Sequence, residues 1–78
     1  MQIDHEIDTR GQTCPLPILK MRRGLAAIRN GALARVRISD PESARDIPDY
    51  LRRQGHELLL SSEVDGEWIF VVRRSMQA

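Results

Sequence analysis

The sequence contains a single cysteine, Cys14, and only two histidines, His5 and His56. One thiol excludes a disulfide within the chain, and it excludes every zinc or iron–sulfur site that needs several cysteines of one chain. The three side chains also lack the close spacing of zinc ligands, so we expect no metal. Whatever chemistry Cys14 performs, it performs as a lone thiol.

Aromatic residues and long apolar runs are scarce as well. Trp68, Tyr50 and Phe70 are the only aromatics, too few to stack the bases of a single-stranded nucleic acid. The longest apolar run, from Trp68 to Val72, has five residues, whereas a membrane-spanning helix needs about 20. We expect neither direct nucleic-acid binding nor insertion into a membrane.

Neither sign of charge dominates, because 12 Lys and Arg against 11 Asp and Glu leave a net charge of +1. No strong field recruits nucleic acid, and the arginine pairs at 22–23, 52–53 and 73–74 are interpreted as solvated surface. The N-terminus carries acids where a secretory signal has basic and apolar residues, so we expect a cytoplasmic protein. With 41% hydrophobic and 29% charged residues, residues 1–78 are typical of one small globular domain.

Periodicity predicts the first half of the fold. Apolar and polar residues alternate over 3–8 and again over 33–39, which predicts two strands. Between them, the apolar residues recur every three or four positions and predict a helix over 15–29, with Lys20 and Arg23 on its opposite face. Asn30-Gly31 suits the left-handed residue that ends many helices, so we expect the helix to end there.

A second helix and a hairpin follow. Asp40 is a good N-cap and Pro41 suits the first helical position. Because proline disrupts a helix interior, Pro48 predicts one turn over 41–45 and a separate main helix over 47–54, closed by Gly55. Asp65-Gly66 between apolar runs at 57–63 and 67–73 predicts an antiparallel hairpin.

The element order β-α-β-α-β-β predicts the fold class. Each helix has one apolar stripe to bury, and a layer of helices on a sheet satisfies both stripes. We therefore expect an α/β two-layer sandwich of the α+β type, with two helices on one face of a four-stranded mixed sheet. Crossovers between parallel neighbours should be right-handed.

The Cys14-Pro15-x-Pro17 stretch places a thiol at the start of the first predicted helix. Prolines cost little in a first turn, and they stiffen the backbone that carries the sulfur. A helix N-terminus supplies partial positive charge and free amide donors, which favour a thiolate over a thiol. Arg10 and Lys20 are near enough in sequence to add positive charge. The position of Cys14 therefore predicts an exposed nucleophile.

Two other interpretations of Cys14 fit less well. Free cysteines are often buried, but the polar loop over 10–13 and the prolines disfavour a core role. A cysteine hydrolase needs a positioned base. His5 lies on the apolar side of its strand and is interpreted as a packed or half-buried core residue, and His56 follows Gly55 and is interpreted as a partner of helix-terminal carbonyls. The sequence thus predicts a nucleophile without a base.

These residues resemble the TusA (SirA-like) family of sulfur carriers over nearly the whole chain. The motifs that carry the resemblance are Asp8-x-Arg10-Gly11-x-x-Cys14-Pro15-x-Pro17, Asp40-Pro41-x-x-x-Arg45-Asp46-Ile47-Pro48, Gly55-His56-Glu57-Leu58 and a last apolar strand ending in Val72-Arg73. The resemblance implies that Cys14 receives sulfane sulfur as a persulfide and delivers it to an acceptor protein. It implies a persulfide carrier rather than an independent enzyme, with no prosthetic group.

The resemblance also implies partners and site residues. The sulfur donor would be a cysteine desulfurase or a rhodanese-like protein, and the carrier would act as a monomer. The residues expected to shape the site are Gly11, Pro15 and Pro17. The residues expected to dock or guide a partner are Arg10, Lys20, Arg23, Arg45 and Asp46.

The pathway stays open at this point. Leu16 stands between the two prolines, where family members linked to tRNA thiolation often carry an acidic residue, and together with Thr13 this departure leaves the acceptor open. Alternatives within the family are sulfur supply for molybdenum-cofactor proteins and sulfur oxidation. A second hypothesis assigns the chain to a different functional class. In it the protein is a regulatory module that binds a protein or a nucleic acid, and the Cys-Pro-x-Pro turn has only a structural role. Loss of sulfur transfer in Cys14→Ser, with folding and docking intact, would distinguish the carrier from the module.

Overall fold

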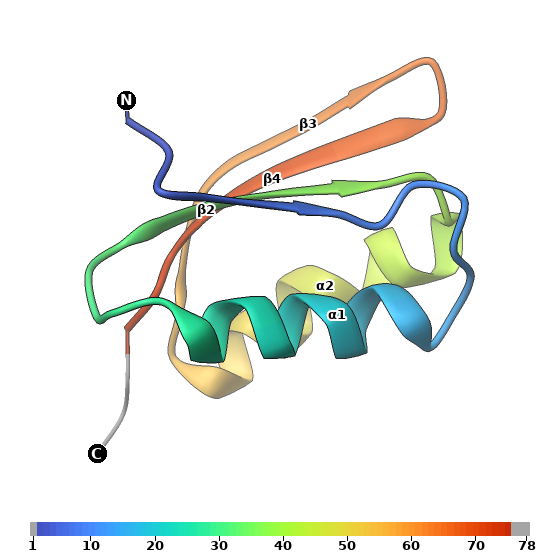
Figure 1. Ribbon diagram of the computed structural model, residues 1–78. Coiled ribbons are helices and arrows are strands. Elements are labelled where there is room, and N and C mark those ends of the chain that lie inside the picture. The colour runs from blue at the N-terminus through green and yellow to red at the C-terminus, as the bar shows by residue number, and fades with distance from the viewer. Residues whose placement is uncertain (1, 76–78) are drawn as a thin grey trace.

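The computed structural model describes residues 2–75 and forms two layers, a sheet and a pair of helices (Figure 1). In chain order the elements are β1 (His5–Asp8), α1 (Leu16–Ala27), β2 (Leu33–Ile38), α2 (Pro41–Gln54), β3 (Glu57–Val64) and β4 (Glu67–Arg73). The sheet order is β1-β2-β4-β3, with β1 parallel to β2 and the other pairs antiparallel. Both helices cover one face of the sheet, which confirms the predicted fold class.

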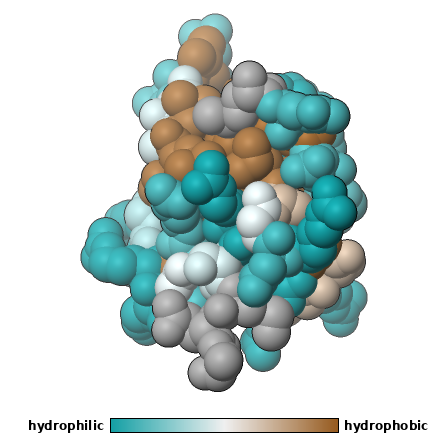
Figure 2. All heavy atoms as spheres, turned by 90° about the vertical axis from the view of Figure 1, so that its left-hand side faces the viewer, coloured by the Kyte–Doolittle hydropathy of each residue, from teal (hydrophilic) through white to brown (hydrophobic). Residues whose placement is uncertain are grey.

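The core lies between that face and the helices. Alternate residues of β2, namely Ala34, Val36 and Ile38, are 0% exposed, as expected for the inward side of a central strand. Their neighbours in the core come from β1, both helices and β4: Ile7, Met21, Leu25, Ala44, Ile47, Leu51, Phe70 and Val72. Seen from one end, apolar side chains gather over the sheet and hydrophilic ones over the helices (Figure 2). No helix in the described part of the chain is long and apolar enough to cross a membrane.

The predicted break in the second helix is wrong, because α2 runs without interruption from Pro41 to Gln54 with Pro48 inside it. Proline removes one backbone donor from the helix. Against that loss, Ile47 and Leu51 are 0% and 1% exposed on the face that packs against the sheet. Burial of this apolar stripe on both sides of Pro48 stabilises the helix as one element. Gly55 closes α2 in the left-handed conformation, as predicted.

The first helix ends earlier than predicted, at Ala27 rather than at Asn30-Gly31. Ile28 is already extended, and the amide of Ala32 donates to the carbonyl of Arg29 at 3.1 Å, which closes a turn. Gly31 takes its positive φ of 85° inside this turn. The glycine therefore serves the turn into β2, and the helix must end before that turn begins.

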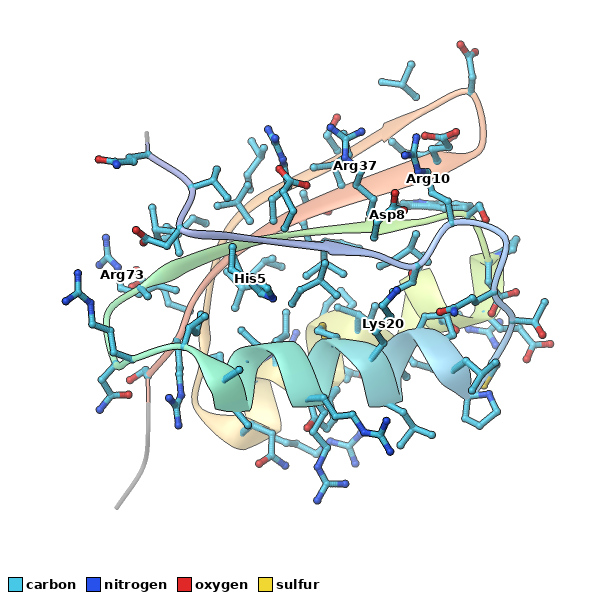
Figure 3. All side chains as sticks on the ribbon, in the orientation of Figure 1. His5, Asp8, Arg10, Lys20, Arg37 and Arg73 are labelled. Carbon is cyan, nitrogen blue, oxygen red and sulfur yellow. The ribbon has the colours of Figure 1, made fainter. Side chains whose placement is uncertain are left out.

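At the N-terminus, β1 begins at His5 rather than at residue 3. His5 lies on the helix side of β1, as predicted (Figure 3), but it is exposed rather than packed. The reason is that β1 is an edge strand and only Ile7 reaches the core. At Gly24 of α1, a Cβ would lie 2.5 Å from Ile7 Cδ1, so glycine allows α1 to approach β1 closely.

The predicted hairpin is confirmed. Asp65 and Gly66 have φ angles of 53° and 79°, the positive values that a tight turn between twisted strands requires. A register shift between Leu58 and Leu60 marks a bulge in β3.

Candidate functional site

Cys14 is exposed at one end of the sandwich, in the loop that leaves β1 and enters α1. Pro15 is the N-cap residue of α1 and is exposed, whereas Pro17 is buried in the first turn. The Cys14–Pro15 peptide bond is cis. The sequence thus predicted correctly that the thiol lies at the helix start, but of the two prolines predicted inside the first turn only Pro17 lies there.

The first turn of α1 contains no acidic residue, and no side chain caps its amides. The partial positive charge of the helix N-terminus lies beside Cys14, and no acidic side chain of the first turn of α1 neutralises it.

The loop before Cys14 is fastened to the end of β2. Thr9 is 0% exposed, and its Oγ1 and backbone N–H both donate to the carbonyl of Arg37, at 2.7 and 2.9 Å. The N–H of Gly11 donates to Ser39 Oγ at 2.8 Å, and Gly11 has a φ of 83° that favours glycine. These contacts fix the backbone of the loop while its tip stays in solvent.

One carboxylate oxygen joins the thiol loop to α2. Asp40 Oδ2 accepts hydrogen bonds from the Cys14 N–H at 3.0 Å, the Ser43 N–H at 3.1 Å and Ser43 Oγ at 2.8 Å. These bonds, that of the Ser43 side chain first, lower the pKa of Asp40. Asp40 is therefore both the N-cap of α2 and the anchor of the Cys14 backbone.

The two cations expected near the thiol are engaged at the end of β1. Arg10 Nε and Nη2 donate to the two carboxylate oxygens of Asp8 at 2.9 and 2.7 Å. This guanidinium lowers the pKa of Asp8 from 3.8 to about 2, mainly through its side-chain hydrogen bond. Lys20 Nζ donates to the backbone carbonyl of Asp8 at 2.8 Å (Figure 3). Both cations therefore bind the end of β1. In the described part of the chain, no hydrogen bond joins either of them to Cys14.

An apolar and basic surface extends from the loop along α1. Leu16 and Leu19, which are 51% and 44% exposed, place two neighbouring apolar side chains on the surface of α1. Together with Gln12, Lys20 and Arg23 they line a shallow pocket of about 270 Å³. We call these five residues the α1 surface. Within it, Gln12 Oε1 is buried without a hydrogen-bond partner among the described residues.

Arg45 and Asp46 lie apart from this surface. Both are well exposed on α2 and contact each other, with 3.9 Å between Arg45 Nε and Asp46 Oδ1. Among the residues that the structure describes, no hydrogen bond or ion pair links either of them to the Cys14 loop. The structure therefore brings Gly11, the prolines and Lys20 to the thiol end of the molecule but gives Arg45 and Asp46 no contact there.

Among the residues that the structure describes, no hydrogen bond joins either histidine to Cys14. His5 lies on β1, and the imidazole of His56 accepts at Nδ1 a hydrogen bond of 3.1 Å from the N–H of Ser75. The interpretation of the His56 side chain as a partner of helix carbonyls is wrong: its backbone N–H, not its ring, donates to the Leu51 carbonyl at 3.0 Å.

Sequence reasoning missed the residues that hold the loop. Thr9 and Ser39 carried no signal, since a single polar residue at a strand end has many possible roles. Asp40 was recognised as an N-cap, but its bond to Cys14 joins residues 26 positions apart. The one sequence signal for this contact is that Cys14 and Asp40 each belong to a motif of the TusA family.

Comparisons with known proteins identify the family. A family model described as "Sulfurtransferase TusA" matches residues 5–74. The chain belongs to the TusA family. A sulfur carrier protein TusA of Allochromatium vinosum is 36% identical over 72 residues, covering 92% of this chain and 95% of that protein. One from Pseudomonas putida is 32% identical over 71 residues, covering 91% and 89%.

A solved structure agrees with this assignment at the level of the fold. The SirA-like protein of Desulfitobacterium hafniense superposes with a TM-score of 0.78 at 20% identity, covering 91% of this chain and 97% of that one. The motif-based resemblance to TusA is therefore confirmed, and the chain is a member of a family of sulfur carriers.

Proposed function

We propose that the protein carries sulfane sulfur as a persulfide on Cys14, between a donor protein and an acceptor protein. The observation that carries the proposal is an exposed thiol at an uncapped helix start, on a loop fastened at Thr9, Gly11 and Cys14 itself. A rigid backbone presents the sulfur outward, where a partner's sulfur can reach it. Membership in a sulfur carrier family supports the same role.

The transfer is a thiol–persulfide exchange that needs no base or prosthetic group on the carrier. The Cys14 thiolate attacks the terminal sulfur of a donor persulfide, a new S–S bond forms, and the donor cysteine leaves as a thiolate. An acceptor thiolate then attacks the terminal sulfur on Cys14, and Cys14 leaves as a thiolate. Each step consumes one thiolate and releases one, with no external oxidant.

The α1 surface supplies the contact area beside the sulfur. Leu16 and Leu19 offer apolar area to a partner, and Lys20 and Arg23 offer charge that guides an acidic surface. The donors that fit this chemistry are a cysteine desulfurase or a rhodanese-like protein, and the acceptor is a protein with its own thiol. We place the exchange in the cytoplasm, where thiols stay reduced. The end use of the sulfur can be tRNA thiolation, molybdenum cofactor or sulfur oxidation.

Two surface leucines of matched exposure test the docking role. Leu19 and Leu60 are 44% and 47% exposed, on α1 and β3 respectively. We expect Leu19→Asp to weaken binding to a cysteine desulfurase about tenfold or more, as for a central interface residue. Leu60→Asp should bind as the wild type does. Binding is measured by titration calorimetry or surface plasmon resonance, and circular dichroism verifies folding.

A Cys14→Ser variant in the same assay separates the carrier from an interaction module. In the carrier, Cys14→Ser keeps its desulfurase affinity but transfers no sulfur. Equal affinities of the Leu19→Asp and Leu60→Asp variants would remove the α1 surface from the account. Sulfur transfer by Cys14→Ser at the wild-type rate would refute the carrier function itself.

A further inference from the structure

A second concave site lies at the other end of α1 from Cys14. There the last turns of α1 and α2 and the end of β4 come together (Figure 1), and they enclose a pocket of about 230 Å³. Its walls come from α1, α2 and the segments that follow α2 and β4. The sulfur chemistry proposed above uses none of these residues. The volume lies below the roughly 300–1,000 Å³ of pockets for drug-sized ligands, so the pocket suits a small molecule.

The lining of the pocket contains three basic side chains. Arg22 and Arg74 contribute guanidinium groups and His56 an imidazole. Arg22 is exposed, and it has no hydrogen bond or ion pair with any residue in the described range 2–75. None of the described lining residues is an aspartate or a glutamate. The positive charge of Arg22 is therefore available to a ligand.

A hydrogen bond fixes the tautomer of the His56 ring. Its Nδ1 accepts the hydrogen bond from the Ser75 N–H, so the neutral ring carries its proton on Nε2. The guanidinium of Arg74 donates to the carbonyl of Ile28, which holds it at the end of α1. Two of the basic groups are thus fixed by the backbone, while Arg22 can adjust to a ligand.

Other residues that line the pocket are apolar. They are Leu25, which is 2% exposed, Ala26, and the half-buried Tyr50 of α2. The Tyr50 hydroxyl makes no hydrogen bond within the described chain. A ligand that matches this lining has an anionic head and a compact apolar body.

We propose that this pocket binds a small phosphate monoester, with the phosphate against Arg22, Arg74 and His56 and the organic group against Leu25 and Tyr50. Guanidinium groups bind phosphate oxygens through paired, charge-assisted hydrogen bonds, which favours phosphate over a halide or other spherical anion. Such a site would let a metabolite bind without covering Cys14.

The pKa of His56 can report whether a ligand occupies the pocket. Burial and then the positive charge of Arg74 lower the pKa of His56. The other titratable or charged groups that line the pocket are Arg22 from α1 and Tyr50 from α2. A bound phosphate dianion adds negative charge beside the ring, favours its protonated form and therefore raises the pKa of His56.

The test uses phenyl phosphate as the probe and NMR as the measurement, at constant ionic strength because salt screens exposed charges. We expect saturable shifts of the Ala26 and His56 signals, with a dissociation constant in the range of about 0.1–10 mM, as for a small ligand with few contacts. The pKa of His56 should rise with probe occupancy. Inorganic phosphate should bind more weakly, since it leaves the apolar lining residues unused.

Two arginine neighbours on α1 provide the matched variants. Arg22→Gln should weaken phenyl phosphate binding about tenfold or more, as expected for a lost charge-assisted contact. Arg23→Gln should bind as the wild type does, because Arg23 lines a different pocket. Both side chains are exposed, so both variants should fold. The absence of saturable shifts, equal effects of the two variants, or an unchanged His56 pKa at saturation would each overturn the proposal.

Discussion

At the scale of single residues, the two cations near the thiol loop bind groups of the protein itself. Arg10 and Lys20 both bind Asp8, one through its carboxylate and the other through its carbonyl. The two cations fix the point where β1 ends and the loop begins. A partner would therefore meet a pre-ordered loop rather than a flexible one.

The Asp8–Arg10 pair makes a prediction about pH. The folded-state pKa of Asp8 is about 2, below the ordinary 3.8, so the pair stabilises the fold fully above pH 4. The stabilisation is lost as the pH falls through 4 toward 2. Because both side chains are about half exposed, solvent screens the pair and we expect its contribution to stability to be small.

Urea unfolding of the wild type and of Asp8→Asn between pH 6 and pH 2 measures this contribution. The stability difference between the two proteins should be constant above pH 4 and should shrink below it. Asp49→Asn is a matched control, since Asp49 pairs with Arg52 on α2, far from the loop in sequence. A difference that stays constant down to pH 2 would contradict the assigned ion pair.

At the scale of elements, the start of α2 and the thiol loop share one anchor. Asp40 caps α2 through Ser43 and holds the Cys14 amide with the same oxygen. Helix formation and loop position are therefore coupled. A change at Asp40 should loosen both segments together.

Amide hydrogen exchange tests this coupling. In Asp40→Ala the amides of Cys14 and Ser43 should both exchange faster, because each loses its acceptor. Asp40→Asn keeps a side-chain oxygen and should restore most of the protection. Asp46→Ala, a change of an exposed aspartate on the same helix, should leave both amides as in the wild type. Unchanged Cys14 protection in Asp40→Ala would show that the bond does not hold the loop.

The positions of helices and strands were also the features that the sequence predicted best. The alternation over β2, the Asp65-Gly66 turn and the Asp40-Pro41 helix start are local signals, and each element formed where its signal lies. The continuity of α2 through Pro48 was missed because it depends on burial of Ile47 and Leu51 against a sheet formed elsewhere in the chain. Rules based on neighbouring residues in the sequence do not include this stabilisation by tertiary packing.

At the scale of the whole molecule, the site is made of segments distant in sequence. The exposed position of Cys14 was predicted from its own motif, but its fastening to Arg37, Ser39 and Asp40 depends on β1 lying parallel to β2. That pairing brings the end of β1 beside the start of α2. The fold thus places the thiol at one end of α1 and the basic pocket at the other.

The most direct test of the account is the intact mass of the reduced protein after incubation with a cysteine desulfurase, its pyridoxal phosphate cofactor and L-cysteine. The wild type should gain about 32 Da, the mass of one sulfur atom, and lose it again on treatment with a reductant, as a persulfide does. Cys14→Ser should gain nothing. If the wild type also gains no mass, with this donor or with thiosulfate and a rhodanese, Cys14 is not a sulfur carrier.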